Sequence, residues 1–376
     1  MDSLICEYKK CTGCAACFSI CPKNCITMHA DDEGFLRPKI DDSMCINCNR
    51  CKKVCPINKK SMEDNKFPTA FAVKHKNDSV REKSSSGGVF TAVSEIILKS
   101  SGVVIGAGFD ENFMVKHKIC NNVESLDELR RSKYVQSRIG TVLQDTKKYL
   151  DKGINVLFVG TPCQVEGLLS YLGKTYTNLY TIDFICHGVP SPMAWKKYME
   201  FRRKSANAEI TDISFRSKEL GWKNFSMKID FSNGNKYSST VSEDIYLRSF
   251  IMDMDLRPSC YDCHFKTIHH LSDFTVADYW GADKQIPEWN DNKGISLVLA
   301  HSEKAINLLA ECNSVDVLEV PFERAIEGNP SLTTSVKQPN LRKKFMREIQ
   351  IKSFDKLHDK YCGNNILAKV RRKMPG

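Results

Sequence analysis

The sequence contains no long hydrophobic run. Apolar stretches such as residues 154–160 and 295–300 have the length of a strand, whereas a membrane-spanning helix needs about 20 apolar residues. The N-terminus reaches Cys6, Lys9 and Lys10 without an apolar segment, so we expect no secretory signal peptide. These absences predict a cytoplasmic protein without an integral membrane segment.

Complete nucleotide-binding motifs are missing as well. Residues 102–109 resemble a dinucleotide-binding fingerprint, but Glu111 stands where its third glycine belongs. Residues 167–175 resemble a phosphate-binding loop, but five residues separate Gly167 from Gly173 where the motif has four. No DNA-binding motif is found either, so we expect no nucleic-acid partner.

Cysteine, by contrast, is abundant, with 17 among 376 residues. A chain of this length with 41% hydrophobic residues can bury a core without disulfides, and clustered cysteines in a reducing compartment indicate metal ligation. Two runs, beginning at Cys11 and Cys45, share the spacing Cys-x-x-Cys-x-x-Cys-x-x-x-Cys-Pro. This spacing is typical of bacterial ferredoxins with two [4Fe–4S] clusters, in which the fourth cysteine of each run ligates the other cluster.

The two runs therefore predict two [4Fe–4S] clusters with interleaved ligands. The ligand sets are Cys11, Cys14, Cys17 and Cys55 for one cluster, and Cys45, Cys48, Cys51 and Cys21 for the other. Zinc is the alternative, because Cys-x-x-Cys pairs also form tetrahedral zinc sites, but zinc does not require a repeated triple followed by Cys-Pro.

Charge near these runs has two interpretations. A [4Fe–4S] cluster with four thiolates carries about −2 when oxidised, so two or three clusters lower the formal net charge of +10 to roughly +6 or +4. The cations Lys9, Lys10, Arg50, Lys52 and Lys53 lie close to the cysteines in sequence. They either attract an acidic electron carrier or form an ordinary solvated surface.

Beyond a polar linker at residues 59–68, apolar runs alternate with helical patterns, which predicts an α/β core. Strands are expected at residues 103–105, 154–159, 179–185 and 295–299, and helices at 90–98, 125–131 and 140–150. Helix starts are indicated by a capping box of Ser125 and Glu128 and by Thr161 and Ser191, each before a proline. Residues 225–239, with Asn-Gly in the middle, predict a β-hairpin inserted in the core.

Four further cysteines follow the predicted strands or lie in a loop: Cys163, Cys186, Cys260 and Cys263. They could converge on a third [4Fe–4S] cluster. Buried free cysteines, a Cys-x-x-Cys redox pair, and zinc bound with His264 are the alternatives. Residues 84–90 form a Ser/Gly turn before a helix, which suits an anionic phosphate or a simple helix cap.

These motifs together resemble a known family. The chain resembles the beta subunits of coenzyme F420-reducing hydrogenases and dehydrogenases, in the form with an N-terminal two-cluster ferredoxin domain. It is also similar to ferredoxin-dependent chlorophyll-pathway reductases that share this core. The matching stretches are residues 84–90, 133–137, 160–164, 186–191, 215–222, 257–263 and 277–281.

The resemblance implies that the core binds a flavin, FAD with FMN as the alternative, between the Gly87–Gly88 turn and residues 133–137. The implied flavin-binding residues are Ser86, Gly87, Gly88, Val89, Lys133, Tyr134, Gln136, Ser137 and Thr161. It also implies that Cys163, Cys186, Cys260 and Cys263 ligate a cluster beside the flavin. Lys133 and His187 are the candidate catalytic residues, with a purely structural, hydrogen-bonded role as the alternative for His187.

We therefore predict an α+β ferredoxin-like domain at residues 1–62 and an α/β flavin-binding core with an inserted β-hairpin. The core would comprise residues 63–150 and 151–320, followed by a helical extension at 321–376. The predicted activity is an oxidoreductase that passes electrons from clusters to a flavin and on to a two-electron acceptor, a deazaflavin or another small organic molecule. Ferredoxin or another redox protein would be the donor. The alternatives are a non-catalytic electron-transfer subunit and a redox sensor.

Overall fold

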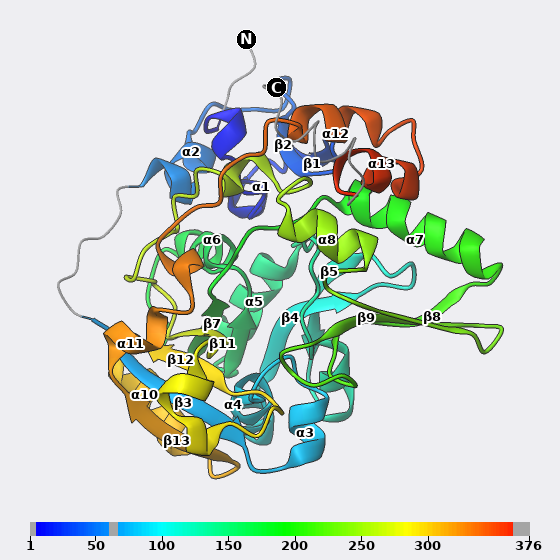
Figure 1. Ribbon diagram of the computed structural model, residues 1–376. Helices are drawn as coiled ribbons and strands as arrows, with labels where there is room; N and C mark the ends of the chain where they lie inside the picture. Colours follow the sequence, from blue (N-terminus) through cyan, green and yellow to red (C-terminus); the bar gives the residue numbers. More distant parts are fainter. Residues whose placement is uncertain (1–4, 60–66, 364–376) are drawn as a thin grey trace.

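An eight-stranded mixed sheet forms the centre of the computed structural model, which describes residues 5–59 and 67–363 (Figure 1). The strand order is β13-β3-β12-β11-β7-β6-β4-β5, and β4, β6, β7 and β11 run parallel. The strands are β3 (Thr69–His75), β4 (Val103–Phe109), β5 (Val115–Cys120), β6 (Val156–Val159), β7 (Leu179–Phe184), β11 (Phe274–Asp278), β12 (Ser296–Ala300) and β13 (Val315–Val320). The predicted α/β arrangement is confirmed, and the two expected parts of the core share this one sheet.

Both faces of the sheet are covered, because neighbouring residues of a strand point to opposite sides. In β4, Val103 and Ile105 contact the side of α5 (Val142–Asp151) and α6 (Pro162–Leu172), whereas Val104 contacts the side of α4 (Val89–Lys99) and α10 (Glu303–Ala310). Burial on both faces explains why the central strands are continuous apolar runs in the sequence.

A second, three-stranded sheet has the order β10-β9-β8, with β8 (Ile210–Ser217), β9 (Ser226–Phe231) and β10 (Lys236–Thr240). The predicted hairpin is thus confirmed as β9–β10, but it pairs with β8 and not with the eight-stranded sheet. Trp195 and Tyr246 lie in the hydrophobic cluster that joins this sheet to α7 (Pro192–Ala206), α8 (Ile245–Ile251), α12 (Arg342–Glu348) and α13 (Phe354–Tyr361).

The N-terminal unit packs on the outer side of α6 (Figure 1). It consists of η1 (Tyr8–Lys10), α1 (Ala16–Ile20), the antiparallel pair β1 (Ile26–Ala30) and β2 (Leu36–Ile40), α2 (Arg50–Val54) and η2 (Pro56–Asn58). Ala16 and Val54 share one hydrophobic cluster with Leu168 of α6 and Leu143 of α5. The unit therefore has no separate core, and its cysteines lie against the α/β core.

Most predicted helix starts are confirmed, and one is wrong. Thr161 caps α6 through a capping box with Gln164, and the Ser191 hydroxyl caps α7. Residues 125–131 form no α-helix. The 3-10 helix η3 (Glu124–Glu128) begins one residue earlier instead, and the Ser125 N–H donates to Asn122 Oδ1 at 2.8 Å, where the expected capping box would have it donate to Glu128.

The remaining short elements lie in the connections between strands. They are α3 (Asp78–Glu82), η4 (Pro258–Cys260), α9 (Ala282–Gln285), η5 (Pro287–Trp289), α11 (Phe322–Ile326) and η6 (Pro330–Leu332). Within the described ranges, no helix is both long and apolar enough to cross a membrane. Most of the predicted linker at 59–68, the boundary between residues 62 and 63, and the end of the helical extension beyond 363 lie outside the described residues.

Candidate iron–sulfur and flavin sites

The first cavity, like the second, is lined by residues of the N-terminal unit, and its Cys14 packs against Gly167 of α6. The first cavity encloses about 340 Å³. Its lining includes all four cysteines predicted for one cluster: Cys11, Cys14, Cys17 and Cys55. The distant Cys55 reaches it because α2 ends one residue earlier, at Val54, and the chain turns inward into a buried Cys-Pro step.

The second cavity encloses about 350 Å³ and is lined only by residues of the N-terminal unit. The four cysteines predicted for the other cluster all line it: Cys21, Cys45, Cys48 and Cys51. Cys48 is exposed, in contrast to the buried Cys14 of the first cavity. The second cavity is therefore the outer one of the two.

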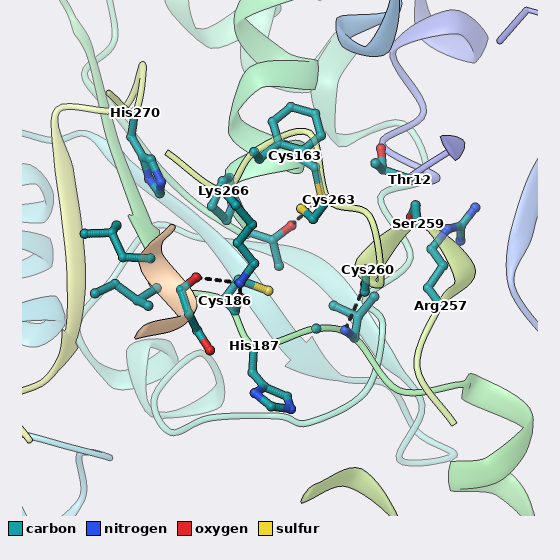
Figure 2. Close-up of a pocket in the computed structure, with 18 residues that line it drawn as sticks. Thr12, Cys163, Cys186, His187, Arg257, Ser259, Cys260, Cys263, Lys266 and His270 are labelled. Atoms are coloured by element: carbon teal, nitrogen blue, oxygen red, sulfur yellow. Dashed lines mark hydrogen bonds between the residues drawn. The ribbon is translucent and has the colours of Figure 1, made fainter. Parts of the chain in front are cut away.

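The third cavity is larger than the other two, at about 520 Å³, and Figure 2 shows the residues around it. Cys163 comes from the first turn of α6, Cys186 follows β7, and Cys260 and Cys263 lie in and after η4. The carboxyl ends of β6 and β7 meet at the same edge of the sheet, which brings Cys163 and Cys186 together. All four cysteines of the predicted third set thus face one space.

Two observations test whether this third cavity fits a [4Fe–4S] cluster. His270 is buried and lines the cavity, its Nδ1 bonds Asp183 at 2.8 Å, and its Nε2 has no hydrogen-bond partner. Such an orphaned imidazole nitrogen suits a sulfur acceptor inside the cavity. In addition, the Val189 N–H already donates to Cys260 Sγ at 3.4 Å. The donor set therefore fits an anionic cluster.

The four cysteines of each set surround a hollow and do not meet at one point. No three Cys, His, Asp or Glu side chains among residues 5–59 and 67–363 are grouped closely enough to hold a single metal ion. His264 packs its ring against Phe265 and is not among the residues lining the third cavity. A cubane needs this wider spacing, whereas zinc needs four ligands about 2.3 Å from one centre.

Burial opposes ionisation of several of these thiols. It raises the pKa of Cys14 to about 12 and the pKa of Cys260 to about 11, and it raises the pKa of Cys163 as well. Thiolates at these positions therefore need a cationic partner, which bound iron supplies.

The residues implied for the flavin surround the loop before α4. The segments at 84–90 and 132–137 touch directly, because Ser132 donates to Ser85 Oγ through its N–H at 2.7 Å and its hydroxyl at 2.9 Å. No side chain caps the N-terminus of α4, which begins after Gly88. This uncapped start suits an anionic phosphate, although the Gly87 N–H already donates to Ser296 Oγ at 3.0 Å.

The other implied flavin residues have partners of their own. Tyr134 stacks on Phe250 at 4.9 Å between ring centroids. Ser137 Oγ bonds His117 Nδ1 at 2.8 Å, and Thr161 Oγ1 lies 3.0 Å from Cys163 Sγ. Gln136 does not face the loop before α4. Its amide donates to the Thr12 carbonyl at 2.8 Å and so joins the core to the N-terminal unit.

The two candidate catalytic residues are not brought together. Lys133 Nζ donates to the carbonyls of Glu128 at 3.0 Å and Arg130 at 2.6 Å, and burial lowers the pKa of this lysine to about 7. His187 lines the third cavity, and its Nε2 bonds Asp253 Oδ1 at 2.6 Å. Only His187 therefore lies beside a predicted cluster.

Sequence reasoning missed several residues of these cavities. Cys6 lines the first cavity and Cys25 the second, where its Sγ lies 3.4 Å from Cys21 Sγ. Their closeness in sequence to the cysteine runs was the available signal. Thr12 and Lys266 also lie close to cysteines in the sequence, but only the fold brings Thr12 to the third cavity and the Lys266 amine to the Cys186 carbonyl.

Comparison with known proteins gives two family matches. Residues 10–59 match the 4Fe-4S dicluster domain, and residues 153–323 match the C terminus of the coenzyme F420 hydrogenase/dehydrogenase beta subunit. An uncharacterized ferredoxin of Methanocaldococcus jannaschii is 34% identical over 55 residues, which cover 15% of this chain and 70% of that protein.

One solved structure with a similar arrangement is a chain of the F420-reducing [NiFe] hydrogenase complex from Methanosarcina barkeri. It is 15% identical, with a TM-score of 0.48, and the similarity covers 80% of this chain and 96% of that chain. The family assignment rests on the two sequence matches, whose residue ranges include most of the cysteines that line the three cavities. The chain is an iron–sulfur protein that carries an N-terminal 4Fe-4S dicluster domain and, over residues 153–323, the C-terminal domain of the coenzyme F420 hydrogenase/dehydrogenase beta-subunit family.

Proposed function

We propose that the protein is an iron–sulfur flavoprotein oxidoreductase. It would receive single electrons at its N-terminal domain and deliver them, through the core, to a two-electron acceptor such as a deazaflavin or another small organic molecule. The observation that carries this proposal is that each of the twelve predicted cysteine ligands lines the same cavity as the other three of its set, with Cys6 and Cys25 as additional cysteines at the first and second cavities.

In this proposal the first, second and third cavities each hold one [4Fe–4S] cluster on the four predicted cysteines. Such clusters supply one-electron transfer, and a flavin supplies the conversion to two-electron chemistry. The chain would hold the thiolates in place around each cavity. His270 Nε2 and the Val189 N–H would donate to sulfur in the third cavity.

The proposed flavin site lies across the loop before α4. The uncapped N-terminus of α4 and the surrounding cations would bind the phosphates. These cations include Arg130, which donates to Thr91 Oγ1 at 3.0 Å, and Lys218, which donates to the Ser86 carbonyl at 2.9 Å. Lys133, held beside this loop by the Arg130 carbonyl, would orient the isoalloxazine or the substrate.

The test is the metal and flavin content of the anaerobically purified full chain. About twelve irons per chain, four for each cluster, and a flavin spectrum are expected. Cys260→Ser should lose about a third of the iron. The control is Cys312→Ser, because Cys312 is also a free cysteine, more fully buried than Cys260, but lines none of the three cavities. Equal iron in the Cys260 variant and the wild type would remove the third cluster from the proposal.

The second candidate function is an electron-transfer subunit without a substrate of its own. It is favoured by two hydrogen bonds within the chain: Lys133 Nζ donates to the Arg130 carbonyl and the Gly87 N–H donates to Ser296 Oγ. Both donors are therefore already occupied without a flavin or a substrate. Turnover of a panel of acceptors by the isolated chain with reduced viologen separates the two functions. Turnover supports the oxidoreductase, whereas cluster reduction without turnover of any acceptor supports the subunit.

A further inference from the structure

The first and third cavities share a wall, and the second cavity is remote from it. Thr12 lines both cavities. Arg257 lines the third cavity, donates from Nε to the Cys11 carbonyl at 2.7 Å, and has its Nη2 3.7 Å from Cys11 Sγ. The second cavity shares no lining residue with the other two. Arg257 therefore lies between the two inner cavities, and Figure 2 shows it on the same side of the third cavity as Thr12.

Arg257 is a buried cation with neutral partners only. Arg257 is 1% exposed. Its guanidinium also donates to the Leu36 carbonyl at 3.0 Å and to Gln136 Oε1 at 2.6 Å. Among residues 5–59 and 67–363, no carboxylate lies within 4.0 Å of its guanidinium. Arg342 is similarly buried, at 3%, but forms a two-bond ion pair with Glu33.

A buried charge without a counter-charge is strongly unfavourable. A guanidinium stays protonated in proteins, so Arg257 cannot escape this cost by losing its proton. The nearest anionic group that the architecture offers is the set of thiolates around the first cavity, since Cys11 belongs to it. A [4Fe–4S] cluster with four thiolates is negatively charged as a whole.

We propose that Arg257 is the counter-charge of the iron–sulfur cluster in the first cavity and makes that cluster easier to reduce. This inference rests on the proposed function, because it needs iron in that cavity. One-electron reduction by an external carrier protein oxidises the carrier and adds one negative charge beside Arg257, with no proton transfer. Arg257 stabilises that added charge. Electrons that enter at the exposed second cavity are thereby drawn to the first cavity, next to the third.

The test is an anaerobic redox titration of the full-length, iron-loaded chain, followed by electron paramagnetic resonance. Signals of the second cavity are assigned with Cys48→Ser, which alters that cavity only. Arg257→Gln should lower the equilibrium constant for reduction in the first cavity at least about tenfold, or about 59 mV for one electron. Arg257→Lys keeps the charge and should stay within about threefold of the wild type. The second-cavity potential should stay unchanged in both variants.

Arg342→Gln is the matched control, because it removes a buried cation between the N-terminal unit and the core without changing the charge at Cys11. Equal potentials in wild type and Arg257→Gln, equal shifts in both Arg257 variants, or an equal shift in Arg342→Gln would overturn the inference. Loss of iron from Arg257→Gln but not from Arg257→Lys would support it, and loss from both would overturn it. A wild-type chain without iron would instead overturn the proposed function.

Discussion

At the scale of single residues, this protein buries groups whose charge state depends on what lies next to them. Burial raises the pKa of several cysteine thiols in the first and third cavities, among them Cys14 and Cys260, whereas a hydrogen bond with Cys6 lowers the pKa of Cys11. Burial also acts on a carboxyl that has no place in the cavities, Asp255, which is fully buried and has an unpartnered Oδ1. Because this carboxyl ionises at a different pH in the folded and the unfolded chain, the free energy of unfolding depends on pH.

We predict that Asp255 makes the fold less stable as pH rises. Burial raises its pKa from an ordinary value of 3.8 to about 7. Between these two values the folded state holds a proton that the unfolded state has lost, so the stabilising effect is present at low pH and is lost as pH rises through this window. The loss is at most about 1.4 kcal/mol per pH unit.

Thermal unfolding of the wild type and Asp255→Asn at pH 5.5 and pH 8 checks this prediction. The melting temperature of the wild type should fall relative to that of the asparagine variant as pH rises. The exposed Glu323→Gln serves as the control and should follow the wild type. Parallel melting curves for wild type and Asp255→Asn at both pH values would contradict the prediction.

At the scale of elements, α6 serves two cavities with one face. Cys163 in its first turn lines the third cavity, and Gly167, four residues later, lies against Cys14 of the first. Residues four apart share a helix face, so the distance between the two cavities is set by one turn of helix. A Cβ at Gly167 would lie 2.8 Å from Cys14 Cβ and 3.0 Å from Cys14 Sγ.

We predict that Gly167→Ala destabilises the protein by about 1–3 kcal/mol through overpacking and lowers its iron content. The direction of the change in stability is informative, because replacing glycine with alanine in an exposed helix stabilises it by about 1 kcal/mol. Thermal unfolding and iron analysis measure both effects. Gly106→Ala is the control, since its Cβ would meet nothing closer than 3.7 Å. If Gly167→Ala had the stability and iron content of the wild type, the prediction would be wrong, because Cys14 could then move away from α6 at no cost in free energy.

At the scale of the whole molecule, α2 of the N-terminal unit lies away from the eight-stranded sheet (Figure 1), and its residues Arg50 and Cys51 line the outer, second cavity. Met44 and Ile46 are 52% and 57% exposed around this cavity, and the cations Lys52 and Lys53 of α2 are exposed too. An apolar patch with a basic rim suits a transient, acidic electron-carrier protein, because charge complementarity raises the association rate.

We predict that the double variant Lys52→Glu, Lys53→Glu slows reduction of the protein by an acidic reduced ferredoxin about tenfold at low salt, with the difference disappearing at high salt. Stopped-flow absorbance measures the rate. Lys99→Glu, Lys196→Glu changes the charge equally on α4 and α7, far from α2 in Figure 1, and should have little effect. Equal slowing by both double variants would mean that net charge, and not this face, guides the carrier.

Much of the fold was predictable where the physical cause is local. Val103, Val156 and Ser296 begin strands inside predicted apolar runs, and Thr161 and Ser191 cap helices as expected because a cap needs only its own helix. Ser125 does not form the expected capping box with Glu128, because its N–H donates to Asn122 Oδ1 and its hydroxyl to the Asn122 carbonyl. The place of the hairpin was also unpredictable, since β8 and the eight-stranded sheet both offer strands to pair with.

The sequence by itself determined how the cysteines of the first two sets are grouped, because the ligand spacing of a two-cluster ferredoxin is a property of short segments. The third set comes from distant segments, which only the fold brings around one cavity. Only the tertiary structure decided that the first cavity and not the second adjoins the third, that Gln136 joins the core to Thr12, and that Arg257 lies unpaired beside Cys11. These contacts join residues more than 120 positions apart. They depend on how the N-terminal unit packs on α6, which no local pattern encodes.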